Sequence, residues 1–420
     1  MSHAGIICPN TPGHVNAMLA LAEATRARGH RVTFFLLGEP PASIAAAGFE
    51  NVPLGGTVFP PDQYRAEFER LGSLQGRAAL KHTLSIGARA ADATLEVGPT
   101  AVRDAGITAL LVDQASFPGG TVADQLGIPF ATVCNALLLN PDPAVPPYFT
   151  HWQPRDAGWA RVRNRIAWAG LNRLYAPILS RIQDRRRRLG LPVPATISTV
   201  WSDKLQISQQ PELFEFPRHE LPKHVRFVGP LRLSVGAQPV PFPWERLDGR
   251  PLIYASLGTL QNRVAGMFRV IAEACGGLDA QLVISTGNGV PPEALGKLPG
   301  NPVVVSYAPQ LDLLRRSTLT VTHAGLNTVL EALSTGLPMV AIPVTNDQPG
   351  IAARVAWIRA GEAIAYKHVT LQALRDAVVR VRSNPSYRAA AERVRDAIHA
   401  SGGAPRAAEL IEHSLALGTR

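Results

Sequence analysis

A short stretch in the second half of the chain combines residue types that could bind an anion. The apolar run Leu319–Thr322 predicts a strand, which leads into a turn with His323 and Gly325. Asn327 and Thr328 then open a predicted helix. The first N–H groups of a helix have no partner within the helix and attract negative charge. Because Gly325 permits close approach to the backbone, the pattern predicts a diphosphate site that needs no metal ion.

Polar side chains beyond this turn extend the predicted site toward a nucleoside and a sugar. Glu331 lies one helical turn beyond Asn327 and Thr328 on the same face, where its carboxylate can accept hydrogen bonds from ribose hydroxyls. Asp347 and Gln348 follow the next predicted strand, and the carboxyl ends of parallel strands are where ligands collect. Paired hydrogen bonds to sugar hydroxyls are a plausible use of these two side chains.

A second candidate pair lies in the first half of the chain. His14 follows the first predicted strand, and Asp113 ends the later strand Ala109–Val112. Two strand ends of one sheet can bring such residues together, and a carboxylate that orients an imidazole favours its use as a proton acceptor. A lone histidine after a strand is more often a turn residue with satisfied hydrogen bonds. The residues alone leave both interpretations open.

The motif around His323 resembles the donor-binding signature of the UDP-dependent glycosyltransferases of the GT-B fold. The likeness runs from Tyr307 to Gln348 with the family's spacing throughout. Tyr307 stands where plant members usually have Trp and Ala324 where they often have Cys, but Tyr307 still offers an aromatic face to a base. The resemblance assigns to uracil Tyr307, Ala308 and Gln310; to the diphosphate His323, Gly325, Asn327 and Thr328; to the ribose Glu331; to the sugar Asp347 and Gln348; and to a further phosphate contact Ser256, Gly258 and Thr259.

The same resemblance gives roles to His14 and Asp113. His14 would take the proton of the acceptor hydroxyl while Asp113 supports it, and the oxygen would attack the anomeric carbon as the diphosphate leaves from the opposite face. Such a displacement inverts the configuration at that carbon. The sequence has no Asp-x-Asp motif for a metal-held diphosphate, no P-loop and no dinucleotide fingerprint. We therefore expect no metal and no cofactor apart from the UDP-sugar donor.

Several stretches outside the donor motif resemble one branch of the family, the bacterial carotenoid glucosyltransferases that act on zeaxanthin. This branch implies glucose as the sugar and a hydrophobic, hydroxylated carotenoid such as zeaxanthin as the acceptor. Flavonoids, macrolides and sterols stay open as acceptors, and a non-catalytic partner protein of the same fold or a nucleotide-sugar epimerase as other functions. The stretches are Val112–Gln114, Ala136–Asn140, Gln206–Gln209, Phe216–Arg218, Ala255–Gln261 and Asp347–Gly350.

The elements that must position these residues form two alternating series of strands and helices. The 420 residues exceed what one hydrophobic core usually supports. Continuous apolar strands followed by helices predict parallel sheets buried on both faces. We expect an α/β, GT-B architecture of two Rossmann-like doubly wound domains that face each other across a cleft. Its predicted parts are an acceptor-binding domain at 1–228, a proline-rich linker at 229–249, a nucleotide-sugar-binding domain at 250–400, and a helix at 401–420 that returns to the first domain.

Positive charge is concentrated in residues 151–188. This segment holds ten arginines and two aspartates, a net charge of +8 out of the formal +10 of the chain. Trp152, Trp159 and Trp168 are interleaved with the arginines. The pattern suits a helix that rests on an anionic membrane. A solvated basic helix with its tryptophans in the core fits it too.

Other classes of partner and location are disfavoured by the sequence. Nucleic acid is not expected, because no helix-turn-helix, zinc module or aromatic sheet motif accompanies the arginines. The apolar runs are far shorter than the ~20 residues that cross a bilayer, and the apolar run near the N-terminus is too short for a signal-peptide core. We expect a cytoplasmic protein, peripheral to the inner face of the cell membrane if residues 151–188 bind lipid.

Overall fold

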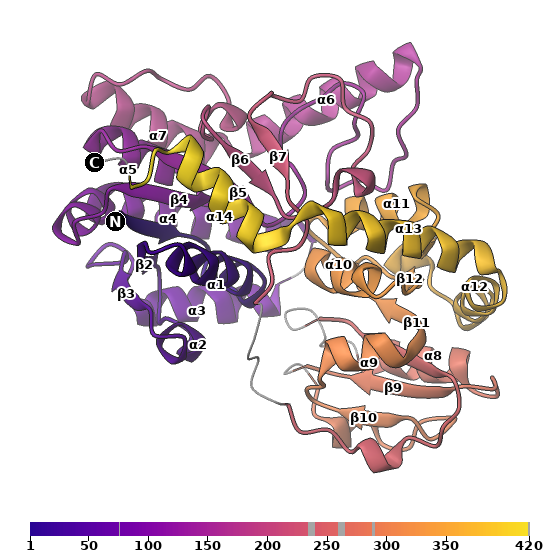
Figure 1. Cartoon of the computed structure of the whole chain (residues 1–420). Coiled ribbons are helices and arrows are strands. Elements are labelled where there is room, and N and C mark those ends of the chain that lie inside the picture. The colour runs from indigo at the N-terminus through magenta and orange to yellow at the C-terminus, as the bar shows by residue number, and fades with distance from the viewer. Residues whose placement is uncertain (75, 234–239, 259–264, 288–289, 419–420) are drawn as a thin grey trace.

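The computed structural model describes residues 1–74, 76–233, 240–258, 265–287 and 290–418. Within these ranges the chain forms two sheets in which every strand pairing is parallel (Figure 1). Central strands of both sheets are buried along their whole length, as expected for strands covered by helices on both faces. The predicted pair of doubly wound α/β domains is confirmed.

The first sheet has the strand order β3-β2-β1-β4-β5-β6-β7. One of its faces packs against α1 and α14, and the other packs against α4 and α5. Its strands are β1 (His3–Ile7), β2 (Arg31–Leu36), β3 (Glu50–Pro53), β4 (Ala109–Asp113), β5 (Phe130–Cys134), β6 (Gln206–Ser208) and β7 (Val225–Phe227). Its helices are α1 (Pro12–Ala27), α2 (Ala42–Ala46), α3 (Pro61–Ser73), α4 (Gly76–Asp104), α5 (Gly119–Leu126), α6 (Gly158–Leu174), α7 (Ala176–Arg188), η1 (Ile197–Thr199) and η2 (Glu212–Phe214).

The second sheet has the strand order β10-β9-β8-β11-β12-β13. Helices α8 and α12 cover one face, while α9, α10, α11 and α13 pack on the other. Its strands are β8 (Leu252–Ser256), β9 (Gln281–Ser285), β10 (Val303–Val305), β11 (Ser317–Thr322), β12 (Met339–Ala341) and β13 (Gly361–Ala363). Its helices are η3 (Trp244–Arg246), α8 (Ala265–Cys275), η4 (Pro292–Leu295), α9 (Gln310–Arg316), α10 (Leu326–Ser334), α11 (Gln348–Trp357), η5 (Tyr366–His368), α12 (Leu371–Ser383) and α13 (Pro385–Ser401), followed by α14 (Gly403–Ser414).

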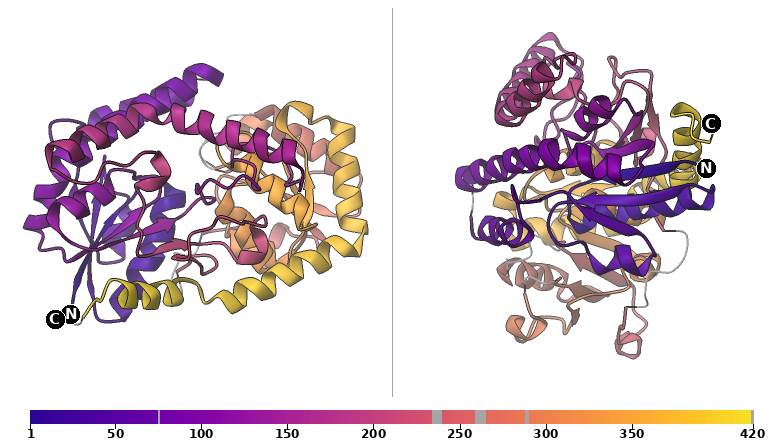
Figure 2. Two further views of the ribbon diagram at one scale, coloured as in Figure 1. Left: turned by 90° about the horizontal axis from the view of Figure 1, so that it is seen from above. Right: turned by 90° about the vertical axis from the view of Figure 1, so that its left-hand side faces the viewer.

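The C-terminal helices cross from the second domain back to the first (Figures 1 and 2). Gly402 and Gly403 separate α13 from α14 with φ values of 84° and 56°, in the left-handed region that favours glycine. The Gly403 N–H donates to the Val228 carbonyl at 2.7 Å. Ala407 and Ile411 of α14 are buried in the core of the first domain. The returning helix predicted at 401–420 corresponds to α14, which begins at Gly403 because the left-handed Gly402 ends α13.

A buried contact also joins the domains near η2. Phe214 belongs to the range predicted for the first domain, residues 1–228, yet it packs in the core of the second domain. Phe216 packs against Ala353 of α11. Between them, Glu215 forms a buried ion pair with Arg354 of α11. This contact fixes the helix whose first residue is Gln348.

No helix in the described ranges is both long enough and apolar enough to cross a lipid bilayer.

Candidate active site

His14 and Asp113 meet at the carboxyl edge of the first sheet. β1 and β4 are neighbours, and Ile7 lies opposite Val112. His14 stands in the first turn of α1, just after β1, and Asp113 is the last residue of β4. His14 Nδ1 lies 2.6 Å from Asp113 Oδ2. The side chain of Asp113 is fully buried while that of His14 is 25% exposed, so the imidazole lies between the carboxylate and solvent.

The Asp113 carboxylate is fixed by two further donors. The Asn135 amide donates to Oδ2 at 2.7 Å, and the Ala115 N–H donates to Oδ1 at 2.8 Å. Asn135 follows β5, the strand next to β4. The sequence analysis did not identify Asn135. A signal was present, because Asn135 is a polar residue directly after an apolar, β-branched run, and His14 and Asp113 also lie near strand ends. These bonds leave the carboxylate one orientation toward the imidazole.

This environment favours a protonated His14. Burial disfavours the imidazolium, but the negative charge of Asp113 and its hydrogen bond outweigh burial and raise the pKa of His14 above its ordinary value. The charge of Asp347 in the second domain acts in the same direction. Since Nδ1 is bound to Asp113, Nε2 is the ring nitrogen left to accept a proton. The predicted base and its supporting carboxylate are therefore brought together.

The residues predicted to bind the diphosphate meet where β8 and β11 end side by side. We use the name cradle for Ser256, Gly258, His323 and Gly325. Ser256 lies opposite Thr322 in these parallel strands, and His323 follows directly. Burial lowers the pKa of His323 to about 4, even though a backbone hydrogen bond with Ser256 opposes that shift. The imidazole is therefore neutral near pH 7 and acts by hydrogen bonding. Its Nδ1 atom is buried and has no hydrogen-bond partner among the described residues, as expected of a group that binds a ligand.

Two glycines make room for the ring of His323. A Cβ on Gly258 would lie 2.6 Å from the ring and one on Gly325 would lie 2.5 Å from it, both closer than real Cβ contacts. Gly258 also has a φ of +80°. Ala324, between His323 and Gly325, has a φ of 66°, a strained value of the kind that collects at functional sites. Thr259, the remaining residue assigned to this phosphate contact, lies outside the described residues.

We expect Gly325→Ala to weaken the binding of UDP by about tenfold or more, because the new methyl group displaces His323 from the cradle. Isothermal titration of UDP measures the change. Gly266→Ala is the matched control, since a Cβ at Gly266 would meet no atom within 4 Å. Unchanged UDP affinity in Gly325→Ala would mean that His323 does not contact the diphosphate.

Residues assigned to the nucleoside meet at the start of α9 and on α10. The Gln310 amide donates to a carboxylate oxygen of Glu331 at 2.5 Å, and the Tyr254 hydroxyl donates to Gln310 Oε1 at 3.2 Å. Tyr307 is 46% exposed, so its ring is available for stacking on a base. Ala308 packs against the core of the second domain. Sequence reasoning missed Tyr254, because a tyrosine within a buried strand looks like core.

Asn327 connects the cradle to the turn that carries His14. Its amide donates to the Gly13 carbonyl at 2.9 Å, and its Oδ1 accepts from Gln209 of the first domain at 3.0 Å. Asn327 was assigned to the diphosphate, and in this structure its side chain instead bridges the two domains. Thr328 is the next residue in the first turn of α10. The predicted anion site and the turn that carries His14 are thus in direct contact where the two domains meet.

The turn between β12 and α11 presents the residues assigned to the sugar. Gln348 Oε1 accepts from the N–H groups of Val344 and Thr345 at 2.8 and 3.0 Å, which orients its amide group. Asn346 has a φ of 55°, in the left-handed region. Burial raises the pKa of the Asp347 carboxyl, with the charge of His14 opposing the shift. Asp347 therefore lies close enough to His14 for each charge to affect the other.

Comparison with known proteins relates the chain to one family. The profile of the family described as "UDP-glucoronosyl and UDP-glucosyl transferase" matches residues 110–401. The chain belongs to this family. It is 31% identical to the "Zeaxanthin glucosyltransferase" of Pseudescherichia vulneris over 99% of this chain and 98% of that protein. It is also 31% identical to the "Zeaxanthin glucosyltransferase" of Pantoea ananas over 100% of this chain and 97% of that protein.

Solved structures of glycosyltransferases share the fold along nearly the whole chain. The crystal structure of the glycotransferase of kitacinnamycin has a TM-score of 0.76 and 25% sequence identity, and it covers 98% of both chains. The GT-B architecture is therefore confirmed, and the chain is a UDP-glycosyltransferase. Its donors are nucleotide sugars and its reaction requires an acceptor.

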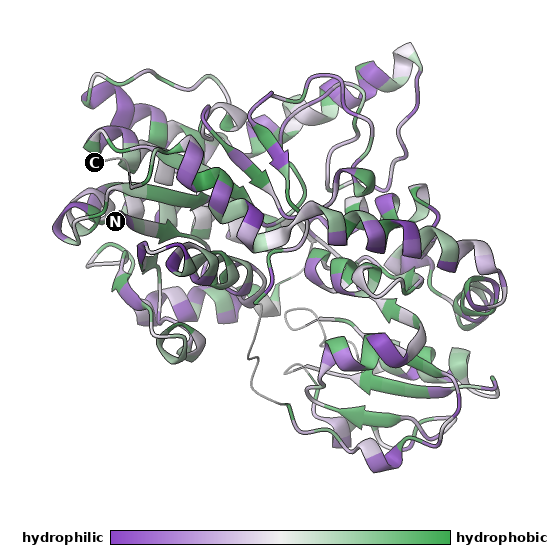
Figure 3. Cartoon of the chain, viewed as in Figure 1, coloured by the Kyte–Doolittle hydropathy of each residue, from purple (hydrophilic) through white to green (hydrophobic). Residues whose placement is uncertain are grey.

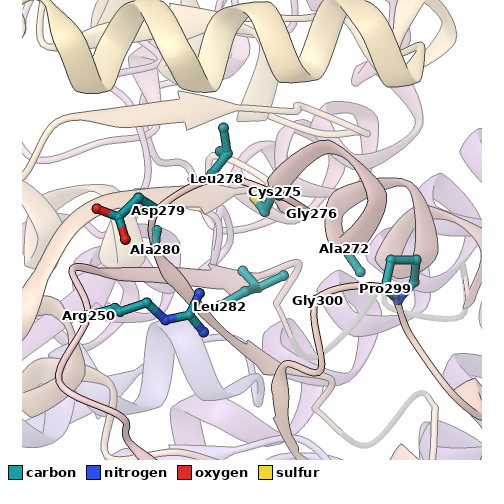
Figure 4. A pocket seen from close by; sticks show the side chains of 11 residues that line it. Arg250, Ala272, Cys275, Gly276, Leu278, Asp279, Ala280, Leu282, Pro299 and Gly300 are labelled. Atoms are coloured by element: carbon teal, nitrogen blue, oxygen red, sulfur yellow. The ribbon is translucent and has the colours of Figure 1, made fainter.

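A hollow of about 320 Å³ elsewhere in this UDP-glycosyltransferase is not the donor site (Figure 4). Arg250, Asp279 and Gly300 line it, and each of them precedes a strand of the second sheet. It therefore lies at the amino ends of the strands, whereas Ser256 and His323 lie at the carboxyl ends, where open α/β sheets bind ligands. No group of three or more His, Cys, Asp or Glu side chains in the described ranges is arranged to hold a metal ion.

Proposed function

We propose that this UDP-glycosyltransferase transfers glucose from UDP-glucose to a hydroxyl group of an apolar acceptor, with inversion at the anomeric carbon. The observation that carries the proposal is the His14–Asp113 pair, held at 2.6 Å and facing the cradle of the second domain. A carotenoid such as zeaxanthin is the proposed acceptor. Glucose and zeaxanthin are supported by the names of the two relatives that match over almost the full chain.

In the proposed reaction, His14 Nε2 takes the proton of the acceptor hydroxyl as its oxygen forms a bond to the anomeric carbon. The bond from that carbon to the diphosphate breaks on the opposite face, so UDP leaves with the electron pair. Asp113 stabilises the imidazolium that forms. The N–H groups at the start of α10 and the neutral imidazole of His323 stabilise the charge on the diphosphate. These groups supply the positive potential, so the proposal requires no metal ion.

The donor is proposed to lie with its uracil on Tyr307, its ribose at Glu331 and its glucose hydroxyls at Asp347 and Gln348. Glu331 already accepts a hydrogen bond from Gln310, and Gln348 is oriented by backbone N–H groups. A side chain that is preorganised in this way spends less entropy on binding. Asp347 would lie between the glucose and His14, consistent with the electrostatic coupling of these two side chains.

An apolar hollow of about 260 Å³ in the first domain supports a hydrophobic acceptor. Trp168 and Leu171 of α6, Leu139 and Tyr175 contribute to its lining. The Tyr175 hydroxyl lies 2.9 Å from that of Tyr148, and the charge of Asp347 raises the pKa of both phenols in addition to the larger effect of burial. The hydroxyl pair of Tyr148 and Tyr175 thus lies within electrostatic reach of Asp347, which is proposed to bind the sugar.

Product analysis tests this proposal. The protein is incubated with UDP-glucose and, separately, zeaxanthin, a flavonoid, a sterol and a macrolide, and products are identified by mass spectrometry. We expect the mass of zeaxanthin to increase by one or two hexose units and NMR to show a β-linkage. If only another acceptor gave a product, that compound would replace the carotenoid as the proposed acceptor. An α-linkage would contradict inversion. No product from any acceptor would favour a non-catalytic partner protein.

A cytoplasmic location is part of the proposal. Cys8, Cys134 and Cys275 are all buried free thiols. Proteins of reducing compartments rarely contain disulfides, and these thiols agree with such a compartment.

A further inference from the structure

Helix α6 is apolar on two opposite faces. Trp159, Val162 and Ile166 follow one another at single-turn spacing and are 57%, 53% and 68% exposed. The solvent face of a surface helix is normally polar. The buried residues of the same helix, on its other side, are Ala160, Asn164, Trp168 and Leu171. Since that second face already satisfies the packing of the helix against the domain, the exposed apolar face serves no purpose within the described fold.

Arginines are interleaved with the aromatic rings of this surface. The guanidinium group of Arg163 lies 4.2 Å from the ring centre of Trp152 and 5.3 Å from that of Trp159. Arg155 lies 5.9 Å from Trp159. We use the name α6 face for Trp152, Trp159, Val162 and Ile166 together with Arg155 and Arg163. Tryptophan and arginine side chains of this kind favour the boundary between lipid headgroups and acyl chains, where one end of each is apolar and the other polar.

The arginines of residues 151–188 differ in how far neighbouring carboxylates neutralise them. Arginines of α7 contact the domain: Arg181 pairs with Asp92, Arg186 with Asp124, and Arg185 donates to Gln125. On α6, Arg161 pairs with Asp156. Arg165 and Arg173 are exposed and form no ion pair within the described ranges. Three arginines of α7, counting Arg187 with Asp184, thus have acidic partners, whereas Arg165 and Arg173 of α6 keep their positive charge exposed in the described part of the chain.

Helix α6 is also placed to reach a flat surface. Its N-terminal end extends beyond both sheets at the upper right of Figure 1. Strongly hydrophilic positions alternate with hydrophobic and weakly polar ones along it (Figure 3). The segment before it is tied to the second domain, because Gln153 donates to the Ala353 carbonyl at 2.9 Å. The projecting end is therefore held in place.

We propose that the α6 face docks the enzyme on an anionic lipid bilayer, with Trp159, Val162 and Ile166 inserted at headgroup depth. Arg165 and Arg173 would contact lipid phosphates. A second copy of the chain fits less well, because a two-fold contact would place these arginines against each other. The proposal goes beyond the transfer reaction and does not rest on the identity of the acceptor.

Vesicle co-sedimentation of the full chain tests the docking surface. The probes are vesicles of phosphatidylcholine alone and of equal parts phosphatidylcholine and phosphatidylglycerol. We expect binding to the anionic vesicles that weakens as salt is added. A variant carrying Trp159→Ser, Val162→Ser and Ile166→Ser should bind them at least about tenfold more weakly. UDP affinity, which does not involve this surface, shows whether each variant is folded.

Two controls make the test specific. The variant Leu80→Ser, Leu371→Ser and Val379→Ser removes apolar residues of similar exposure elsewhere, and it should bind vesicles like the parent. Arg165→Gln with Arg173→Gln should reduce binding more than Arg188→Gln with Arg393→Gln. Equal binding to both vesicle types, or no loss in the α6 variant, would overturn the proposal. A solution dimer that the α6 variant dissociates would overturn it in favour of an interface between copies.

Discussion

Replacing His14 by alanine is expected to lower kcat by about a thousandfold, the range of effect of a positioned general base. Loss of this side chain should leave the core packing intact, because the imidazole is 25% exposed and its polar contact is with Asp113. The acceptor hydroxyl would then lose its proton only to water. Initial rates with UDP-glucose and the acceptor identified by product analysis measure the change.

The donor half of the site should be untouched by this substitution. UDP affinity is expected to stay within about twofold of the parent, since His323 and α10 belong to the second domain. His219→Ala provides the matched control, because His219 is exposed in the same domain and, within the described ranges, forms a hydrogen bond through its backbone N–H and none through its ring. Full activity of His14→Ala would refute the proposed mechanism, and loss of UDP binding would assign His14 to the donor site.

The pH dependence of kcat/KM distinguishes a base from a merely structural histidine. A base must be neutral, so the rate rises with pH as His14 loses its proton. Because Asp113 raises the pKa of His14 above its ordinary 6.5, the acidic limb of the parent profile should lie above that value. Asp113→Asn removes the charge that raises this pKa, so the limb should move to lower pH while the maximal rate falls. A limb that does not move would mean that another group titrates.

Much of the fold was predictable because local and global signals agree. The strand predicted at Ala109–Val112 is β4 at Ala109–Asp113, and the strand predicted at Leu319–Thr322 is β11 at Ser317–Thr322. The predicted bounds therefore differ from the observed ones by one or two residues at one end. Short, β-branched apolar runs that alternate with helical segments favour buried strands of a parallel sheet. The candidate site was predictable for a related reason, because its polar residues lie at the carboxyl ends of parallel strands, where ligands bind.

Contacts between distant segments were not predictable from the sequence. Nothing in the spacing of Asn327 indicates that its amide binds the Gly13 carbonyl, because that bond depends on how the two domains approach each other. The tryptophans of the basic segment show the same limit. Trp168 is buried and Trp159 is exposed, although both stand in the same arginine-rich helix. Helical spacing separates the two faces, but only the fold decides which one is covered.

In the contact near η2 that joins the domains, one buried carboxylate faces two buried guanidinium groups. Glu215 is a single buried carboxylate that pairs with Arg354 of α11 and lies 3.7 Å from Arg218. Gln210 and the Phe216 N–H also donate to it, at 2.7 and 2.9 Å. Removing Glu215 leaves two buried guanidinium groups without their counter-charge. Removing Arg354 leaves the carboxylate with Arg218 and both of the other donors.

We therefore expect Glu215→Gln to lower the free energy of unfolding by about 3–5 kcal/mol and Arg354→Met to lower it by less. Urea denaturation measures both. Glu412→Gln, which breaks a partly exposed pair with Arg28 between α14 and α1, should cost under about 1 kcal/mol. Equal losses in all three variants would show that the buried carboxylate has no special role.

The pH dependence of the unfolding free energy provides a second test of Glu215. Burial raises the pKa of Glu215, but the charges of Arg354 and Arg218 outweigh burial and hold it below the ordinary 4.5. A carboxylate whose pKa is lowered on folding stabilises the fold above its unfolded pKa, and this stabilisation is lost as the pH falls through the folded value. Below about pH 4.5 the parent should thus lose stability more steeply than Glu215→Gln. The difference between their free energies of unfolding should therefore become smaller. A constant gap down to acid would mean that the ion pair does not stabilise the contact between the domains.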